Sequence, residues 1–513
     1  MRILPVCFVW VLVVSGVDAE IRREHERISE SLHERLRQLA AGEEMAILVS
    51  LKNTFDAPAY RVKSAIHKKQ LLMDLKNRAE RDQKNLRHYL KQQKSTDVRS
   101  LWINNTIALR ADPELISQLS GFPEVESIRA DDIIHLGDLP SGQPGSPQWH
   151  LDAIGVPVLW ALGLDGSGVV VACMDTGVDL NHPDLTGRWR GGPNSWKDLY
   201  QSSPLPYDPL GHGTAIMGIM VGGNFGGTAI GAAPGAQWIA VRIFDDNGDA
   251  PYSKIHEGFQ WLLDPDGNPD TQDSPDIVNN SWGMHFGVNQ CISEFQQDIE
   301  ILKTAGIAVV FAAGNSGPLP STSVSPANNQ NNVSVGAVGE TGLIAPFSSR
   351  GPTPCNDEIF PTLSAPGVNI KTADLTGGGA IPDSYVYVSG TSFAAALVSG
   401  SMALLIGAMP DKDINQIEKA MILSASDAGQ LGPDYLYGHG MINAVAAYEF
   451  LASLCISDLD QNYEVGLSDL ELFAAQWMMP GCEACQGDVN QDGAVDYLDF
   501  YILSRQFGNN TCR

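Results

Sequence analysis

The spacing of hydrophobic residues divides the chain into regions with different expected folds. Between residues 20 and 135, two charged segments with helical spacing (29–40 and 64–94) alternate with the strand-like runs MAILVSL (45–51) and VESIRADDIIHL (125–136). Such an alternation over about a hundred residues predicts a small α+β domain.

Apolar runs of another kind extend from residue 148 to residue 452. They are rich in β-branched residues, do not alternate with polar positions, and are separated by helical segments such as KIHEGFQWLL. Strands buried on both faces and joined by helices predict an α/β fold with a parallel sheet between two helical layers. Reactive groups in such sheets gather at the carboxyl ends of the strands. The predicted strands are 169–175, 238–244, 276–282, 307–314 and 333–339.

Two further segments have neither pattern. Residues 1–19 combine one Arg, an apolar run from Ile3 to Val14 and a small-residue exit at Ala19, which together predict a secretory signal peptide. Residues 138–147 are rich in Pro, Gly and Ser and predict a linker or a processing site. Because no later apolar run reaches the length of a membrane span, we expect a secreted, soluble protein.

The net charge of −27 is distributed unevenly. Residues 20–136 carry 20 Lys and Arg against 18 Asp and Glu, whereas the chain from residue 137 onward carries 12 against 41. The acidic part should repel nucleic acid and anionic membranes. Acidity alone names no partner, because an acidic surface also suits a protein that is soluble in salt or binds divalent cations.

Three short motifs carry candidate chemistry. Asp175 ends the run VVVACMD, His212 lies in GHGTAIMGIMVG, and Ser392 lies in GTSFAAALVSG before an apolar helix. Each alone has a structural explanation, as a strand-end cap, a turn residue or a helix cap. In the chain order Asp, His, Ser they match one known arrangement of the nucleophilic triad. The G-x-S-x-G elbow of other hydrolases does not fit, because Ala394 occupies the position of its second glycine.

The motifs GVVVACMDTGVDLNHPDL, GHGT, FAAGNSG and SGTSFA resemble those of the subtilisin-like serine proteases. Residues 147–448 follow that pattern with few gaps, and GAAPGAQWIAVRIF, DIVNNSW and LSAPGVNI look closest to the bacillopeptidase F branch. The resemblance implies a subtilisin-like peptidase domain over residues 148–452 and hydrolysis of peptide bonds.

The resemblance also implies roles for single residues. Ser392 would attack the carbonyl carbon, His212 would move the proton, and Asp175 would orient the imidazole. Asn315 would donate to the oxyanion together with the Ser392 N–H, unless it is only a turn residue. Two rims would hold an extended peptide, with Trp282 as an apolar wall and Val324 near the floor of the pocket for the side chain before the scissile bond. The residues of these rims are Ser281, Trp282, Gly283, Ala312, Ala313 and Gly314.

The chain departs from the family pattern at several positions. Ala215 follows GHGT where the family has His, and Ala396-Leu397 stand where it has Pro-His; we expect local repacking without loss of activity. Asp184 fits a ligand of the family's calcium loop, but residues 222–231 lack a clear Asn at the matching position.

Residues 20–137 match the size and position of the family's propeptide, which inhibits the protease and assists its folding. The basic-leaning charge of this segment would attract it to an acidic enzyme. The alternative is an unrelated N-terminal binding domain.

The C-terminal residues 455–513 contain a duplication. Residues 458–477 and 488–507 align at a shift of 30, and apolar residues at helical spacing follow the loop in each copy. The second copy matches an EF-hand-type calcium loop with Gly493 at its sharp turn, whereas the first is a poorer match because Tyr463 replaces that glycine and Gly466 fills position 9. The pair resembles a dockerin, which implies bound Ca²⁺ and a cohesin-like partner at a scaffold or cell surface. The competing interpretation is a calcium-stabilised structural cap. The candidate ligands are Asp458, Asp460, Asn462, Glu464 and Asp469 in the first loop, and Asp488, Asn490, Asp492, Ala494, Asp496 and Asp499 in the second.

The cysteine spacing repeats with the duplication and predicts one disulfide per copy, Cys455–Cys482 and Cys485–Cys512. A buried free Cys173 is expected in its strand, and a Cys291–Cys355 bridge is compatible with the sequence.

Together these features predict a secreted serine endopeptidase, made as a zymogen, with its own propeptide as inhibitor and a calcium-dependent docking tail. The alternatives are a catalytically silent binding protein on the same scaffold, and a protein whose main function is the tail. The four intact residues Asp175, His212, Ser392 and Asn315 argue against the silent form.

Overall fold

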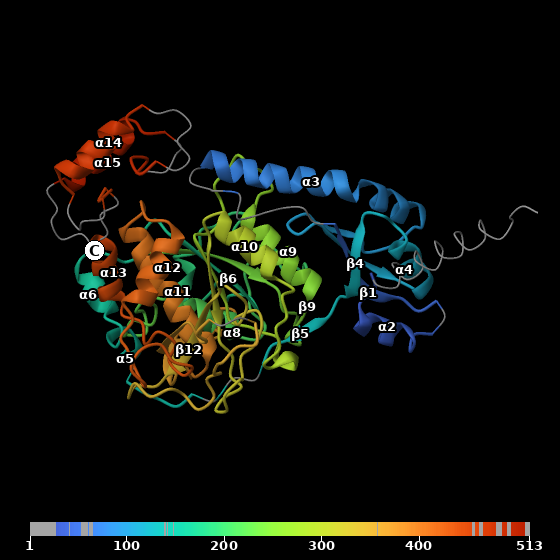
Figure 1. The fold of residues 1–513 in the computed structure, drawn as a ribbon. Helices are drawn as coiled ribbons and strands as arrows, with labels where there is room; N and C mark the ends of the chain where they lie inside the picture. Colours follow the sequence, from blue (N-terminus) through green and yellow to red (C-terminus); the bar gives the residue numbers. More distant parts are fainter. Residues whose placement is uncertain are drawn as a thin grey trace, which may run out of the picture.

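The computed structural model describes residues 27–40, 42–52, 60, 65–137, 140, 142–146, 148–355, 358–453, 457–460, 465–478, 485–489 and 494–507. They form an N-terminal unit (27–137), a large central unit (148–453) and a small C-terminal unit (457–507), as Figure 1 shows. The predicted signal peptide lies outside the described residues.

The N-terminal unit is a four-stranded antiparallel sheet of order β2-β3-β1-β4 with helices packed against it. The expected α+β organisation is therefore present. Its core combines strand residues such as Ile47 and Ile107 with Leu86 and Leu90 of the long helix α3. Its elements are α2 (Glu30–Leu36), β1 (Met45–Leu51), α3 (Ala65–Gln92), β2 (Arg99–Leu101), β3 (Thr106–Ala111), α4 (Pro113–Ser120) and β4 (Val125–Ala130).

The run VESIRADDIIHL does not form one strand. After β4 the chain turns away from its sheet, and β5 (Ile133–His135) pairs antiparallel with β9 (Asp249–Pro251) of the central unit. Asp131 lies between the two strands and accepts hydrogen bonds from the backbone N and the Oγ of Ser253. This bond caps the helix that begins at Tyr252 and fixes the point where the chain passes between the units.

The central unit contains a seven-stranded parallel sheet of order β13-β12-β11-β10-β6-β8-β7. All five predicted strands are present, and β7 and β13 at the two edges were not predicted. The strands are β6 (Val170–Asp175), β7 (Trp196–Asp198), β8 (Gln237–Arg242), β10 (Ile277–Asn280), β11 (Ala308–Ala312), β12 (Val333–Val338) and β13 (Leu363–Pro366).

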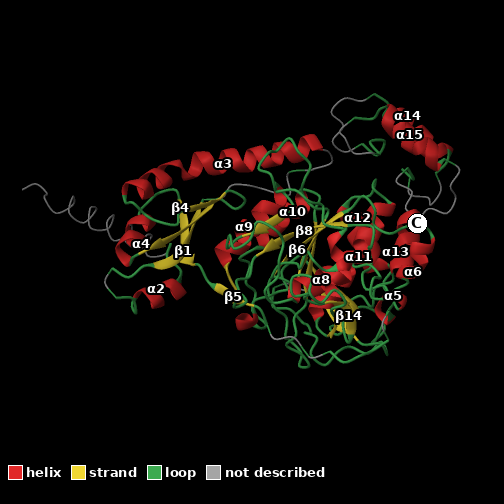
Figure 2. Ribbon diagram, turned by 180° about the vertical axis from the view of Figure 1, so that it is seen from behind, coloured by secondary structure: helices red, strands yellow, loops and turns green. Residues whose placement is uncertain are grey.

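Helices cover both faces of this sheet (Figure 2). On β6, Val171 and Cys173 belong to one apolar core with the helices α8 and α11, whereas Ala172 and Met174 belong to the other with α9 and α10. This is why the strands are apolar without alternation. The helices are α5 (Trp149–Asp152), α6 (Val156–Ala161), α7 (Pro183–Thr186), α8 (His212–Val221), α9 (Tyr252–Leu263), α10 (Gln296–Thr304), α11 (Thr391–Ala408), α12 (Ile414–Leu423) and α13 (Ala444–Ser453), with a 3₁₀ turn at His285–Gly287 and a hairpin of β14 (Ile370–Ala373) and β15 (Tyr385–Val388).

Among the described residues, α11 is the one helix long and apolar enough to cross a membrane by length and composition. Its most apolar window is 83% buried inside the protein. It is therefore the central helix of the core.

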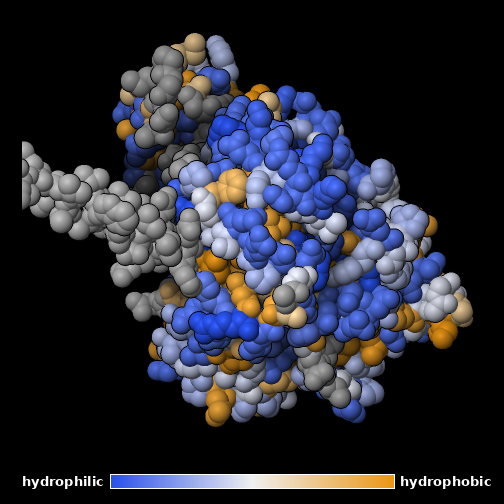
Figure 3. Space-filling view, turned by 90° about the vertical axis from the view of Figure 1, so that its right-hand side faces the viewer, coloured by the Kyte–Doolittle hydropathy of each residue, from blue (hydrophilic) through white to orange (hydrophobic). Residues whose placement is uncertain are grey.

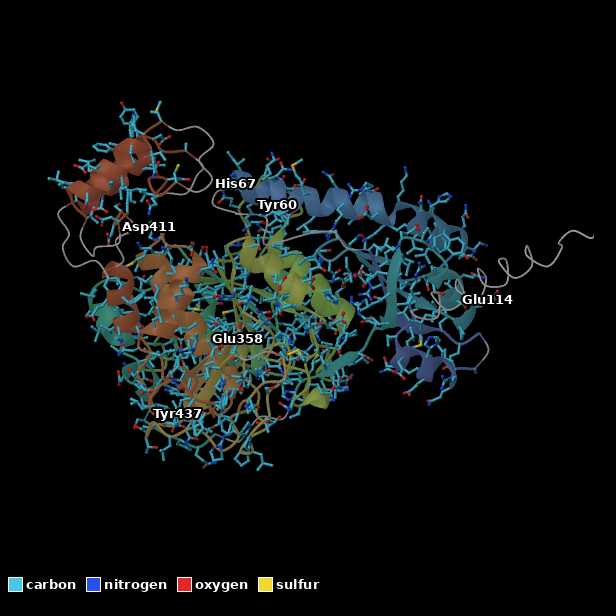
Figure 4. The ribbon with its side chains drawn as sticks, viewed as in Figure 1. Tyr60, His67, Glu114, Glu358, Asp411 and Tyr437 are labelled. Carbon is cyan, nitrogen blue, oxygen red and sulfur yellow. A yellow bond between two sulfur atoms is a disulfide. The ribbon has the colours of Figure 1, made fainter. Side chains whose placement is uncertain are left out.

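The N-terminal unit lies against α9 and α10. Helix α3 extends beyond its own sheet and passes over the central unit, with His67 near its first turn and Tyr60 close by, while Glu114 lies at the far end of the N-terminal unit (Figure 4). Lys68, Lys69 and Lys76 of α3 bond to Ser274, Asp270 and Asp264 of the acidic loop that follows α9. Seen from the N-terminal side, the surface is largely hydrophilic with small apolar patches (Figure 3).

The C-terminal unit repeats one local structure. Helices α14 (Leu467–Ala475) and α15 (Tyr497–Gln506) each begin with a capping box, in which Asp469 and Asp499 accept hydrogen bonds from the backbone N of Gly466 and Asp496. Phe473 and Leu503 share one small core, as the helical spacing predicted.

Two cysteine predictions can be compared with the structure. Cys291 and Cys355 form a disulfide, and Cys173 is free and buried. Cys485 is disulfide-bonded, but Cys455, Cys482 and Cys512 lie outside the described residues, so the predicted pairing of the tail stays a prediction.

Candidate active site

Three elements of the central unit bring the predicted triad residues to one end of the sheet. Asp175 is the last residue of β6, His212 is the first residue of α8, and Ser392 lies in the first turn of α11. All three side chains are buried, with residue exposures of 1%, 5% and 4%. Residues more than two hundred positions apart in the chain thus meet where parallel strands end.

The carboxylate of Asp175 holds the imidazole of His212. Nδ1 of His212 lies 2.7 Å from Oδ1 of Asp175, and the same oxygen accepts the backbone N–H of Thr176 at 2.8 Å. Burial alone lowers the pKa of His212, but the charge of Asp175 and the hydrogen bond outweigh burial and raise that pKa above its ordinary value. The bond also fixes the tautomer, because Nδ1 carries the proton and Nε2 is left as the base.

Small residues allow this close approach. A Cβ on Gly213 would lie 2.1 Å from the carbonyl oxygen of Gly177, so only glycine fits beside His212. The N–H of Gly213 donates to Oγ1 of Thr176 at 2.9 Å. Asp208 accepts from the backbone N of Gly211 and from the N and Oγ1 of Thr214, and so fixes the turn that begins α8.

Ser392 points to the neighbouring rim in this structure. Its Oγ donates to the carbonyl oxygen of Ser281 at 3.3 Å, while Nε2 of His212 has no hydrogen-bond partner within the described part of the chain. The ring of Phe393, next along α11, lies 5.9 Å from the imidazole centroid. Rotation of the Ser392 hydroxyl about χ1 is the movement that would join it to His212.

Asn315 follows β11 and faces the start of α11. Its Oδ1 accepts two hydrogen bonds from Thr391, from the backbone N at 3.0 Å and from Oγ1 at 2.9 Å. These bonds fix the amide so that its NH₂ group turns away from Thr391. Together with the helix N-terminus at Ser392, this arrangement offers donors to a negative oxygen.

The two predicted rims flank Ser392. Ser281 and Ser392 exchange two hydrogen bonds, since Oγ of Ser281 donates to the carbonyl of Ser392 at 2.9 Å. Ala312 is the last residue of β11, Ala313 and Gly314 follow it, and the N–H of Gly314 donates to Oγ1 of Thr391.

The ring of Trp282 does not form an exposed wall, because it is only 4% exposed and contacts Phe259, Phe295 and Phe311 in the core. The ring packs in the core beneath the backbone of Ser281 to Gly283, the first rim. Val324 instead lies between the rims: a Cβ on Gly283 would lie 3.0 Å, and one on Gly314 2.8 Å, from its Cγ2.

The residues that depart from the family motifs are buried. Ala215 is 4% exposed, and Ala396 and Leu397 are fully buried in α11. They contribute to the same apolar core as the rest of α8 and α11. The expected local repacking is consistent with this burial.

Asp184 contacts other protein groups with both carboxylate oxygens. Its Oδ1 accepts the N–H of Phe225 at 2.9 Å, and its Oδ2 accepts the hydroxyl of Tyr385 at 2.7 Å. Arg188 donates to the backbone carbonyl of Asp184 at 3.2 Å, and the ammonium of Lys371 lies 4.8 Å from the ring centroid of Tyr385. The role of Asp184 as a calcium ligand stays a prediction.

The candidate calcium ligands of the tail are partly described. The carboxylates of Asp458, Asp460 and Asp469 each place one oxygen within 4.8 Å of the others, close enough to hold one cation. Asp488, Ala494, Asp496 and Asp499 are described in the second loop, where Asp496 caps α15. Asn462, Glu464, Asn490 and Asp492 lie outside the described residues.

Two supporting residues escaped the sequence analysis. Thr391 belongs to the SGTSFA motif and orients Asn315, and Asp208 lies four residues before His212 and orders its turn. The first had a signal in the motif itself. The second had none, because an Asp in a loop usually caps a turn.

A buried carboxylate–imidazole pair beside a serine at a helix N-terminus, with amide donors opposite, is the site of a serine hydrolase. Residues 166–440 match the model of the subtilase family. The chain is 34% identical over 427 residues to bacillopeptidase F of Bacillus subtilis (strain 168), a match that covers 76% of this chain and 29% of that protein. It is 32% identical over 346 residues to subtilisin E of the same strain, with 67% and 80% covered.

The subtilisin of Bacillus pumilus is 32% identical over 305 residues, with 59% of this chain and 98% of that protein covered. The chain belongs to the subtilase family, the subtilisin-like serine endopeptidases. It spans under a third of the length of bacillopeptidase F.

Proposed function

We propose that this protein is a secreted serine endopeptidase that hydrolyses peptide bonds with Ser392, His212 and Asp175. The observation that carries the proposal is the 2.7 Å hydrogen bond between buried Asp175 and His212. Burying a charged carboxylate costs free energy. The position of the buried Asp175 carboxylate against the imidazole of His212 therefore favours a catalytic site over a silent scaffold.

The reaction follows from the positions of these groups. Ser392 Oγ attacks the carbonyl carbon of an extended substrate while Nε2 of His212 takes the hydroxyl proton. Asp175 stabilises the imidazolium without accepting the proton. The developing oxyanion receives hydrogen bonds from Nδ2 of Asn315 and the N–H of Ser392. His212 then gives its proton to the leaving amine, and water releases the acyl group by the same steps.

The N-terminal unit acts as the propeptide that keeps the enzyme a zymogen. The support is the strand β5, which lies along β9 and lets the chain enter the substrate groove. The ion pair between Arg129 and Glu294 and the lysine contacts of α3 hold the unit on α9, α10 and the acidic loop. The matches to bacillopeptidase F and subtilisin E cover more of this chain than residues 166–440 do, so the similarity extends beyond the peptidase core.

The C-terminal unit binds Ca²⁺ and docks the enzyme onto a cohesin-like partner. Support for the metal comes from the convergent carboxylates of Asp458, Asp460 and Asp469, since Ca²⁺ prefers several hard oxygen ligands. Calorimetric titration of the Ser392→Ala chain with CaCl₂ tests this. Asp460→Asn should weaken binding about tenfold or more, whereas Glu471→Gln in α14, outside the cluster, should not.

Labelling with a fluorophosphonate probe tests the enzymatic proposal. Processed protein should be modified at Ser392 and lose its hydrolysis of casein, and the Ser392→Ala chain should show neither labelling nor hydrolysis. Processed, folded protein that the probe leaves unmodified and that does not cleave casein would favour the silent scaffold.

A further inference from the structure

A segment of the N-terminal unit, Ile133 to Gly137, lies along β9 of the central unit. Ile134 of β5 stands opposite Ala250 of β9, and its side chain is 1% exposed in the core that also contains Tyr252 and Ile255. The neighbouring side chains alternate outward, since Ile133 is 45% exposed. An extended segment with alternate side chains buried is how a peptide binds by strand addition.

The next two residues lead to the triad. The N–H of Leu136 donates to the carbonyl oxygen of Gly248 at 2.8 Å, which continues the β5–β9 ladder by one step. A Cβ on Gly248 would lie 3.3 Å from Cβ of Leu136 and 3.8 Å from Leu210, which is two residues before His212. Leu136 therefore lies beside the turn that carries the catalytic imidazole.

Gly137 lies on the opposite side, by the rim of Ser281. A Cβ on Gly137 would lie 2.9 Å from Nε2 of His285, four residues after Ser281. Ser281 in turn exchanges two hydrogen bonds with Ser392. Gly137 thus lies beside the loop that follows Ser281, and the segment from Ile134 to Gly137 runs from β9 toward this side of the site.

The space for a larger side chain at this point is limited. A Cβ on residue 137 would require the imidazole of His285 to shift, and Val324, fully buried, fills the space between Gly283 and Gly314 with its methyl group. Gly314 is followed directly by Asn315, the oxyanion donor of the proposed mechanism. The space that adjoins the reacting carbonyl is therefore narrow.

We infer that this enzyme cleaves after small residues, glycine above all, and that it processes itself at the bond between Gly137 and Asp138. The inference rests on the proposed peptidase activity and adds its substrate class. The enzyme should also prefer an apolar aliphatic side chain three residues before the small one, because Ile134 is buried three residues before Gly137. Two observations favour the same residue type: Val324 limits the space beside the site, and the bound segment has a glycine, Gly137, at this position.

The step balances as an acyl transfer. Oγ of Ser392 forms a bond to the carbonyl carbon of Gly137, the bond to the nitrogen of Asp138 breaks, and the hydroxyl proton passes through His212 to that nitrogen. Water then adds to the ester, releases the Gly137 carboxylate, and restores Ser392. The mature enzyme begins at Asp138.

Two measurements on the full-length chain test the inference. Mass spectrometry of the processed protein should give an N-terminus at Asp138, and the Ser392→Ala chain should stay uncut. The processed enzyme is then given peptides of sequence IHLXDLP with Gly, Ala or Phe at X. We expect kcat/KM for Gly and Ala to exceed that for Phe about tenfold or more, because one misfit group in such a pocket changes rates about 10- to 200-fold.

The variant Val324→Ala should raise kcat/KM for the Phe peptide relative to Gly by at least about fivefold. Val335→Ala, equally buried in β12, is the matched control and should leave the ratio unchanged. An active enzyme that prefers Phe, or that starts at another residue, overturns this inference and leaves the peptidase proposal intact. Processed protein that cuts none of the peptides or casein overturns both.

Discussion

Nδ1 of His212 donates a hydrogen bond to Oδ1 of Asp175 at 2.7 Å, in a setting where both side chains are almost completely shielded from water. The carboxylate raises the pKa of the imidazole against the opposing effect of burial. In the proposed mechanism His212 must be neutral to accept the Ser392 proton, so we expect this pair to set the lower end of the pH range for activity.

The first prediction concerns this pH range. In the wild type, kcat/KM should rise with pH through an apparent pKa above the ordinary histidine value of about 6.5. Asp175→Asn should move that midpoint to lower pH and reduce kcat by about 10⁴-fold, the order of loss seen when this carboxylate is removed from other triads. Rates measured from pH 5 to 10 with a small peptide substrate check both effects. An unshifted midpoint in the variant would show that Asp175 does not raise the pKa of His212.

The second prediction separates the two functions of the Asn315 amide. Asn315→Asp keeps an oxygen for the two hydrogen bonds from Thr391 but removes the NH₂ donor. Turnover should fall roughly 10²–10³-fold, as it does when the corresponding donor is removed from subtilisin itself, with KM little changed. Thr391→Ser keeps the hydroxyl donor and serves as the control, with kcat within about threefold of wild type. A variant Asn315→Asp with normal kcat would leave Asn315 as a turn residue.

The sequence predicted the sheet because its central strands are buried on both faces and therefore apolar throughout. It did not predict β7, whose residues Trp196 to Asp198 include the exposed Lys197 at the sheet edge. Nor did it predict that VESIRADDIIHL divides at Asp131. That division depends on the hydrogen bonds from Ser253 to Asp131. Ser253 lies more than a hundred residues away, so a local sequence pattern could not predict the division.

The site was predictable where motifs are local and less so where contacts are distant. Asp175, His212, Ser392 and Asn315 stand in short motifs whose residue types already suggest their chemistry. The buried position of the Trp282 ring depends instead on three phenylalanines from α9, the segment before α10, and β11. In the same way, the contact of the Asp184 carboxylate with the hydroxyl of Tyr385 joins residues two hundred positions apart in the chain.

The third prediction concerns release of the N-terminal unit at acid pH. Arg129 donates to Glu294 at 2.8 Å, and Glu294 also contacts His256, which in turn contacts Asp298 and Asn104. Burial raises the pKa of Glu294, but the charge of Arg129 and the bond from His256 outweigh it and lower the pKa to about 2. The pKa of His256 is raised to about 9 because the two carboxylates outweigh its burial.

Because Arg129 lowers the pKa of Glu294, the ion pair between them holds the N-terminal unit on the central unit more strongly when Glu294 is ionised. Its contribution is complete above the ordinary glutamate pKa of about 4.3 and is lost as pH falls toward 2. After self-cleavage, the N-terminal fragment should co-elute with the enzyme at pH 7 on size exclusion, and it should bind more and more weakly as the pH falls from about 4 toward 2.

Arg129→Met should weaken the complex at pH 7 by at least about tenfold, because it leaves Glu294 buried without its cation. Arg110→Met is the control, since Arg110 is exposed and, among the described residues, bonds to the carbonyl of Glu44 within the N-terminal unit. Equal retention of the fragment at pH 7 and pH 3 would contradict the prediction.

The fourth prediction is that the loop at Asp184 stabilises the central unit without calcium. The hydroxyl of Tyr385 and the N–H of Phe225 bond to the two carboxylate oxygens, and the charge of Arg188 acts on the same carboxylate. In the Ser392→Ala chain, which cannot digest itself, calorimetry should therefore give the same Tm for the central unit in EDTA and in CaCl₂. Tyr385→Phe removes a hydrogen bond to a charged group, so it should lower the free energy of unfolding by about 1.5–3 kcal/mol in both buffers. Tyr387→Phe, on the same strand β15, is the matched control and should change it by less than about 0.5 kcal/mol. A Tm of the central unit that falls in EDTA for the wild type, but not after Asp184→Asn, would instead show that this carboxylate binds calcium.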